Sequence, residues 1–264
     1  MKIFCNQHHQ LHHGQQEMFR GQLVDCHEVP QRLDHVIQEL AKRPVGEMLQ
    51  PPSHLDLDAA LLRVHTSDYL SFLSTAWTEW VQLNPDNANR DALPSVWPLP
   101  GKHAFRMDKP PLNFAAKLGQ YAFDAGTPLM SGTWAAAREG AACAVAAAQA
   151  LIDGEQVTVA LTRPPGHHAG AAYMGGYCFL NNAAIAAEHL KAQGIERIAI
   201  LDIDYHHGNG TQAIFDERRD IYTVSIHGDP LTEYPFFLGH ADERGSNEGE
   251  GFNLNLPLPK GTGF

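Results

Sequence analysis

The chain has 264 residues, of which 44% are hydrophobic, 19% charged and 9% aromatic, proportions that suit one compact globular domain with a sizeable core. They exclude fibrous and disordered chains, because the 23 glycines and 17 prolines show no period and the apolar content is too high for a solvated chain. The 19 Lys and Arg against 30 Asp and Glu give a formal charge of −11. We therefore expect no nucleic-acid or membrane partner and an attraction for cationic substrates.

The cysteines and the N-terminus indicate a reducing compartment. Cys5, Cys26, Cys143 and Cys178 show neither CxxC nor paired spacing, which argues against a disulfide framework and a structural zinc cluster. The N-terminus lacks the apolar core of a signal peptide, and the alanine-rich run at 141–150 is too short to cross a membrane. We expect a cytoplasmic protein.

In chain order, the first predicted element is a short strand at 3–5, followed by a polar, histidine-rich loop at 6–14. Apolar residues at helical spacing predict a helix over 33–40, which Pro44 and the following glycine end. One or two further helices are predicted over 61–80.

Residues 84–115 form the least regular stretch. They include six prolines together with Trp97 and Phe105. A loop this long inside a compact domain usually has a function or lies in an interface, and a surface excursion without a function is the alternative.

The second half of the chain alternates helices and strands. We predict helices over 133–152 and 182–193, and strands at 157–161, 197–201 and 221–226, of which 197–201 is expected to be buried. Strand, helix and strand in repetition indicate a mostly parallel sheet with crossover helices, within one α/β domain that spans residues 1–264.

The residues after the strand at 197–201 suggest a metal site. Asp202, Asp204 and His206 alternate along an extended segment and can project to one side, at the carboxyl end of a strand, where open α/β sheets bind ligands. Two carboxylates and an imidazole suit zinc and its neighbours. The alternative is a polar strand end whose aspartate caps the next helix.

A pair of adjacent histidines, His167 and His168, follows the strand at 157–161 in a stiff Pro-Pro-Gly turn. Two imidazoles with different partners can supply both a base and an acid. A histidine pair alone is weak evidence and is as often structural or incidental. Its position at a second strand end favours one shared site, of the metal hydrolase type.

Three segments, at 163–169, 175–182 and 202–210, together resemble the zinc-dependent histone deacetylase superfamily. Segments 227–230 and 234–239 are most similar to its bacterial acetylpolyamine amidohydrolase branch. Residues 9–14 and 132–134 fit that branch as well, so the resemblance covers essentially the whole chain. It implies an arginase/deacetylase-like three-layer fold, with helices on both faces of the sheet.

The resemblance implies roles for the residues of both motifs. Asp204 and His206 would be zinc ligands, and His168, next to His167, would be the general base that activates the attacking water. Asn209 stands at the position where some family members have a second acidic partner.

In the same way, Asp202 would hydrogen-bond His167, and Asn209 would face His168. A carboxylate raises the pKa of a neighbouring imidazole much more than an amide does. This pairing would keep His168 neutral and able to accept a proton.

The remaining implied residues bind cations or line the substrate tunnel. A structural K⁺ or Na⁺ would be held by Asp202, Asp204, the carbonyls of His206 and Ile226, and the Ser225 hydroxyl. Phe215, Arg218 and Ile221 match backbone positions of a second such site. Gly176, Tyr177 and Tyr234 would line a narrow acyl-lysine tunnel.

The implied activity is zinc-dependent hydrolysis of acetylated polyamines or similar small cationic amides. A protein acyl-lysine deacetylase and a non-catalytic interaction module of the same fold are the alternatives. The resemblance also implies a homodimer in which residues 84–115 close the mouth of the site, with Trp97 and Phe105 as apolar anchors.

The family's third zinc ligand, an Asp, and its carbonyl-polarising Tyr would come after Phe264. The family's last two strands also insert between the strand that ends at Leu161 and the one that ends at Asp202. We therefore expect these residues to be part of a longer enzyme, with a genuinely short, inactive homologue as the alternative.

Several other polar residues have two interpretations. The histidines at 8, 9, 12 and 13 either form a metal tract or belong to a loop at the cleft rim or a subunit interface. Glu17 and Asp124 are candidates for attracting a distal ammonium group, or are solvated charges. We expect Cys178 to be packed beneath the tunnel and not to act as a nucleophile, and His65 to be structural.

Overall fold

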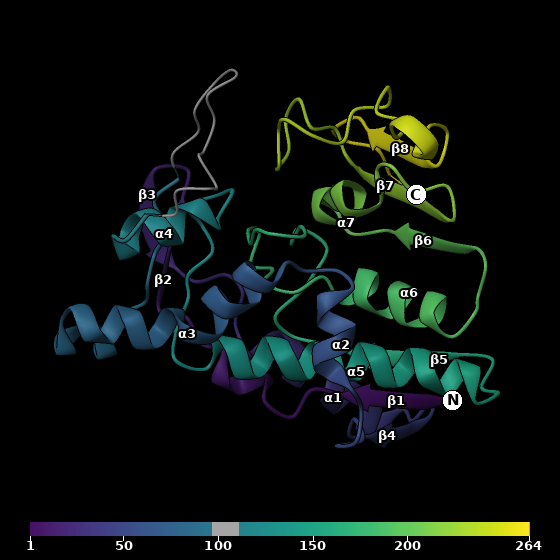
Figure 1. Cartoon of the computed structure of the whole chain (residues 1–264), viewed down its shortest axis with the longest axis horizontal. Coiled ribbons are helices and arrows are strands. Elements are labelled where there is room, and N and C mark those ends of the chain that lie inside the picture. Colours follow the sequence, from purple (N-terminus) through teal and green to yellow (C-terminus); the bar gives the residue numbers. More distant parts are fainter. Residues whose placement is uncertain (97–110, 264) are drawn as a thin grey trace.

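A computed structural model describes residues 1–96 and 111–263 (Figure 1). The helices are α1 (Gln31–Lys42), α2 (Leu57–Leu62), α3 (Ser67–Leu83), α4 (Phe114–Gln120), α5 (Thr133–Ile152), α6 (Asn182–Ala192) and α7 (Asn209–Phe215). The strands are β1 (Lys2–Cys5), β2 (Gln16–Phe19), β3 (Gln22–Asp25), β4 (Glu47–Leu49), β5 (Thr158–Leu161), β6 (Ile198–Asp202), β7 (Ile221–Gly228) and β8 (Asn253–Leu258). Short 3₁₀ turns are η1 (His9–Leu11), η2 (Pro85–Asn89) and η3 (Asn247–Gly249).

Apart from the hairpin β2–β3, the strands in the described part of the chain form two separate parallel sheets. One has the order β4-β1-β5 and the other the order β6-β7-β8. The α/β class expected from the sequence is confirmed, but within 1–96 and 111–263 no strand joins β5 to β6. Helix α5 packs against β1, β5 and α6, and α6 in turn contacts β6, so the two helices connect one sheet to the other (Figure 1).

Helix α5 packs closely because its sequence is rich in alanine and glycine. Ala136, Ala141 and Cys143 are fully buried, and their small side chains let neighbouring backbones approach. The main core forms where α2, α3, α5 and α6 meet, around large side chains such as Tyr69, Phe179 and Ile185. No helix in the described part of the chain is long and apolar enough to span a bilayer.

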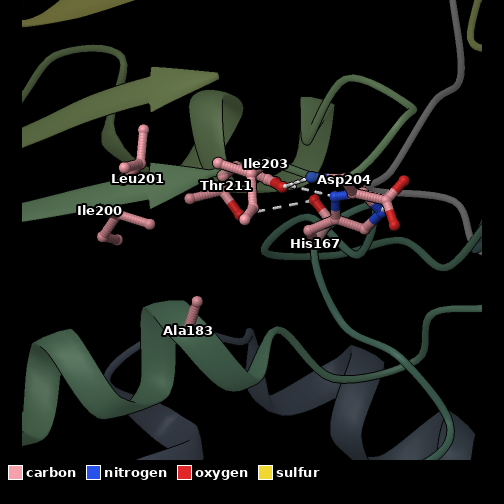
Figure 2. Close-up of a pocket in the computed structure, with 8 residues that line it drawn as sticks. His167, Ala183, Ile200, Leu201, Ile203, Asp204 and Thr211 are labelled. Atoms are coloured by element: carbon pink, nitrogen blue, oxygen red, sulfur yellow. Dashed lines mark hydrogen bonds and ion pairs between the residues drawn. The ribbon is translucent and has the colours of Figure 1, made fainter. Parts of the chain in front are cut away.

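The prediction that 197–201 is buried was wrong. Leu201 is 62% exposed and Ile203, just beyond β6, is 75% exposed. The physical reason is that β6 pairs only with β7 among the described strands, so it is an edge strand with one side uncovered. An open depression of about 470 Å³ lies there (Figure 2). It is lined by His167, Ala183, Ile200, Leu201, Asp202, Ile203, Asp204 and Thr211.

Several elements were not expected from the sequence, among them the antiparallel hairpin β2–β3, the strands β4 and β8, and the helices α4 and α7. The hairpin turns at Arg20 and Gly21, whose φ angles of 49° and 80° match a two-residue turn of the primed type. Gly21 is the one feature of the local sequence that indicates this turn. In the irregular stretch, η2 and α4 are formed, whereas the proposed anchors Trp97 and Phe105 lie outside the described residues.

Candidate active site

The turn after β5 and the start of α7 meet at the carboxyl end of β6. The Thr211 N–H donates to the His167 carbonyl over 3.1 Å (Figure 2). A Cβ at Gly210 would lie 2.3 Å from the Ala169 carbonyl oxygen, closer than real Cβ atoms approach. The small residue at this position therefore lets α7 pack directly on the segment with both histidines.

His167 is held by a carboxylate. Its Nδ1 lies 2.8 Å from Asp202 Oδ2, and because a carboxylate only accepts, the Nδ1–H is the donor. Burial alone would raise the pKa of Asp202, but the hydrogen bond and charge of His167 hold it below its usual range. A Cβ at Gly208 would lie 2.3 Å from Asp202 Oδ2, so the glycine leaves room for this contact.

The imidazole of His168 contacts a side-chain amide and not a carboxylate. Its Nδ1 lies 2.7 Å from Asn209 Oδ1, and the side chain is 3% exposed. Burial and the neighbouring His167 lower the pKa of His168 well below its usual range, against the opposing effect of the Asn209 hydrogen bond. With Nδ1–H donated to Asn209, the lone pair of His168 is on Nε2.

Asp204 and His206 lie beside the pair. His206 Nδ1 is 3.5 Å and His167 Nε2 is 4.0 Å from Asp204 Oδ1. A carboxylate oxygen and an imidazole nitrogen so close together are suitable zinc donors. They fit two of the three protein ligands that catalytic zinc sites use. Within the described ranges, no three His, Cys, Asp or Glu side chains are grouped so that they could hold a metal ion.

The predicted tunnel residues lie around the same histidines. A Cβ at Gly176 would lie 2.1 Å from the His168 ring, and both Gly176 and Tyr177 have positive φ, 53° and 66°. The Tyr234 ring stands edge-on to His168, with centroids 5.0 Å apart, and to His206, with centroids 5.7 Å apart. The structure therefore brings Gly176 and Tyr234 to the tandem histidines.

The residues predicted to bind monovalent cations come from neighbouring segments. Asp202 on β6 is paired in register with Ser225 on β7. The Ser225 hydroxyl lies 2.8 Å from His227 Nδ1. The residues predicted for the second cation site lie between α7 and β7. The Arg218 N–H donates to the Phe215 carbonyl over 2.9 Å, and Ile221 is the first residue of β7.

The N-terminal histidines do not share one environment. His9 and His12 are buried, whereas His8 and His13 are exposed. Burial lowers the pKa of His12 to about 3. His12 and His9 lie beside a buried ion pair in which Arg163 Nη2 is 2.8 Å from Glu28 Oε2, at the start of the segment that carries His167 and His168.

Cys178 and His65 are buried. The Cys178 thiol donates to the Gly176 carbonyl, and burial raises its pKa, which opposes nucleophilic chemistry. His65 Nε2 accepts from the Asn181 N–H over 3.0 Å, and burial lowers the pKa of His65 to about 4.

The structural roles of Glu17 and Asp124 were missed from the sequence. Glu17 is 1% exposed and accepts from the Tyr177 hydroxyl over 2.8 Å and from His27. Asp124 accepts from the Tyr234 hydroxyl over 2.6 Å. Neither is a freely solvated charge. The Asp-Ala-Gly-Thr pattern at 124–127 indicates a side-chain-capped turn, but nothing local identifies the distant partners.

Comparisons with known proteins show the family of the chain. The family described as "Histone deacetylase domain" matches residues 26–264. The chain is 45% identical to acetylpolyamine amidohydrolase 2 of Pseudomonas aeruginosa over 96% of its own length and 71% of the relative's. It is 38% identical to the acetylpolyamine amidohydrolase of Mycoplana ramosa, over 100% of this chain and 75% of that one.

Among solved structures, the crystal structure of an acetylpolyamine aminohydrolase from Burkholderia pseudomallei superposes with a TM-score of 0.90 at 38% identity. The match covers 99% of this chain and 73% of that one. Sequence and fold agree in these comparisons, and the chain belongs to the histone deacetylase family.

Proposed function

We propose that this protein hydrolyses the acetamide bond of acetylated polyamines or similar small cationic amides, with His167 and His168 as catalytic residues and Asp204 and His206 as zinc ligands. A third protein ligand is proposed to come from outside the described residues. The observation on which this proposal depends most is the unequal environment of the tandem histidines. One Nδ1 meets the Asp202 carboxylate and the other meets the Asn209 amide.

The unequal partners favour unequal protonation. His168 is buried, donates Nδ1–H to an amide and keeps a free lone pair on Nε2, so it is suited to take a proton from the attacking water. The tandem pair then returns a proton to the leaving amine. General acid–base catalysis of this kind contributes roughly 10²–10⁴-fold to a rate.

Bound zinc would polarise the acetamide carbonyl and make water a better nucleophile. The chain's own residues would hold and orient the substrate. Tyr177 and Tyr234 would enclose its methylene chain, and each buried CH₂ contributes about 0.8 kcal/mol.

The substrate class is supported by the relatives and by charge. Both curated relatives are named for acetylpolyamines, and the formal charge of −11 favours cationic ligands. The test is turnover of N-acetylputrescine against an acetyl-lysine peptide by protein expressed from its complete reading frame. We expect a higher kcat/KM on N-acetylputrescine. Equal or higher kcat/KM on the peptide would support a protein deacetylase instead, and no turnover with zinc present would support an interaction module.

We further propose a structural K⁺ or Na⁺ at Asp202, Asp204 and Ser225, a homodimer, and a cytoplasmic location. The register of Asp202 with Ser225 supports the first, and four free thiols support the last. Deletion of the proline-rich loop at 84–115 should turn the dimer into a monomer in light-scattering mass measurements. A deletion variant that stays dimeric would contradict the interface.

A further inference from the structure

The carboxylate of Asp124 lies between the two aromatic residues proposed as tunnel walls. Its Oδ2 accepts from the Tyr234 hydroxyl over 2.6 Å and from the Gly176 N–H over 2.7 Å. Its Oδ1 accepts from the Thr127 hydroxyl over 2.9 Å and from the Gly126 N–H over 3.2 Å. Four donors therefore converge on one side chain.

Thr127 extends the same contact to the other wall. While its hydroxyl donates to Asp124, Thr127 Oγ1 accepts from the Tyr177 N–H over 3.0 Å. Two successive amides, those of Gly176 and Tyr177, are thus held by residues 124–127. Both residues have positive φ, and Tyr177, which has a Cβ, keeps this disfavoured conformation only if its surroundings hold it.

The hydrogen bond from the Tyr234 hydroxyl to Asp124 fixes the direction of the Tyr234 ring. That ring stands at 87° to the His168 ring and at 89° to the His206 ring. The Phe123 ring, next to Asp124 in sequence, supports it with centroids 5.9 Å apart. A rotated Tyr234 would lose these edge-on contacts and change the space beside the histidines.

Two simpler explanations do not account for these contacts. A local turn cap explains only the bonds to Gly126 and Thr127, because the partners of Oδ2 are 52 and 110 residues away in sequence. A site for a substrate ammonium needs free acceptor positions, whereas a carboxylate has about four and here four donors use them.

We propose that Asp124 is a positioning residue that sets the width of the substrate tunnel, by holding the Gly176–Tyr177 turn and the Tyr234 hydroxyl at the same time. The expected effect of Asp124 on substrate binding rests on the proposed function. Its effect on the conformation of Gly176, Tyr177 and Tyr234 does not. The tunnel walls touch the methylene chain equally in the ground and transition states, so their displacement weakens binding more than the chemical step.

The test compares Asp124→Ala and Tyr234→Phe with Asp68→Ala as the matched control. Asp68 also accepts from a tyrosine hydroxyl, that of Tyr121 over 3.1 Å, but on α3. The first measurement is amide hydrogen exchange of Gly176 and Tyr177 in protein from the complete reading frame. Exchange should become roughly tenfold faster in Asp124→Ala and stay unchanged in Asp68→Ala.

The second measurement is the steady-state kinetics of N-acetylputrescine. In Asp124→Ala we expect KM to rise about tenfold while kcat changes less than about threefold. The double variant Asp124→Ala with Tyr234→Phe should resemble Asp124→Ala alone, because both changes remove the same hydrogen bond.

The outcomes separate the two proposals. Unchanged exchange at Gly176 and Tyr177, an unchanged KM, or fold-changes that multiply in the double variant would each overturn the positioning role. If the wild-type protein turns over no acetylated amine, the proposed function fails while the exchange data still decide the role of Asp124. If Asp124→Ala does not fold, Thr127→Val and Tyr234→Phe, which leave the carboxylate in place, are measured instead and must raise exchange and KM respectively.

Discussion

At the scale of single residues, the site depends on which atom faces each imidazole nitrogen. His167 and His168 are adjacent in sequence, yet their Nδ1 atoms meet a carboxylate and an amide. Asp204 and His206 have their oxygen and nitrogen donors 3.5 Å apart next to this pair. Each assignment therefore makes a separate prediction for a single substitution.

Asp204→Ala or His206→Ala should abolish both zinc binding and turnover, because a site with few ligands loses most of its affinity when one is removed. His35→Ala, on the exposed face of α1, is the control and should keep both. Zinc content measured by elemental analysis checks this. Wild-type zinc in Asp204→Ala would refute the ligand assignment.

His168→Ala should behave differently from the ligand variants. Zinc should remain, while kcat falls by roughly 10²–10⁴-fold because proton transfer is lost. Loss of zinc in this variant would mean that His168 is a ligand and not the base.

Buried His65 predicts a stability that depends on pH. The pKa of His65 is lowered by burial from 6.5 to about 4, so the folded state favours the neutral ring. This stabilisation is complete above pH 6.5 and is lost as the pH falls toward 4, by about 3 kcal/mol at most, since one pKa unit corresponds to about 1.4 kcal/mol.

Urea unfolding of His65→Gln against wild type between pH 7 and pH 4 checks this. Glutamine does not titrate and can still accept from the Asn181 N–H, so the variant should lose less of its unfolding free energy over this range. Identical pH dependence of the two proteins would contradict the prediction.

At the scale of elements, the close approach of α7 to the tandem-histidine turn positions the site. A Cβ at Gly210 would lie 2.3 Å from the Ala169 carbonyl oxygen, and backbone cannot move aside as a flexible side chain can. Gly210→Ala should therefore push α7 away from His167 and His168, with a loss of stability of about 1–3 kcal/mol and a lower kcat.

The control is Gly140→Ala on α5, because a Cβ at that position would lie 3.4 Å from its nearest neighbour, an ordinary van der Waals contact. It should not lower the unfolding free energy by more than about 0.5 kcal/mol. Thermal unfolding and kcat are measured for both variants. A Gly210→Ala protein with wild-type values would show that the packing of α7 is not limiting.

Elements with strong local patterns could be predicted from sequence. Helix α5 begins and ends at the predicted residues, because a long alanine-rich run between Gly132 and Asp153 leaves no other local solution. Strands β4 and β8 were missed because β4 has only three residues and β8 contains a proline. Their extended conformation comes from pairing with β1 and β7, which no local pattern records.

At the scale of the whole molecule, the formal charge of −11 predicts electrostatic attraction of cationic substrates. Raising sodium chloride from 20 mM to 500 mM should lower kcat/KM for N-acetylputrescine by about tenfold, because the Debye length falls well below 10 Å. Neutral N-acetylbutylamine is the matched substrate and should change less than about twofold. An equal salt effect on both substrates would exclude steering by charge.

The sequence by itself determined the family and the α/β class, and it predicted the residue types of the candidate site. It could do so because the proposed ligands, the proposed base and their neighbours lie in two short segments that each follow a predicted strand. In an open α/β sheet, residues just after parallel strands meet at the same edge of the sheet. The tertiary structure alone decided that Glu17 meets Tyr177 across 160 residues and that Asp124 meets Tyr234 across 110. The physical reason is that the periodicity of a segment indicates only the conformation of that segment. The hydrogen-bond partners of a buried carboxylate depend on which distant segments fold against the carboxylate.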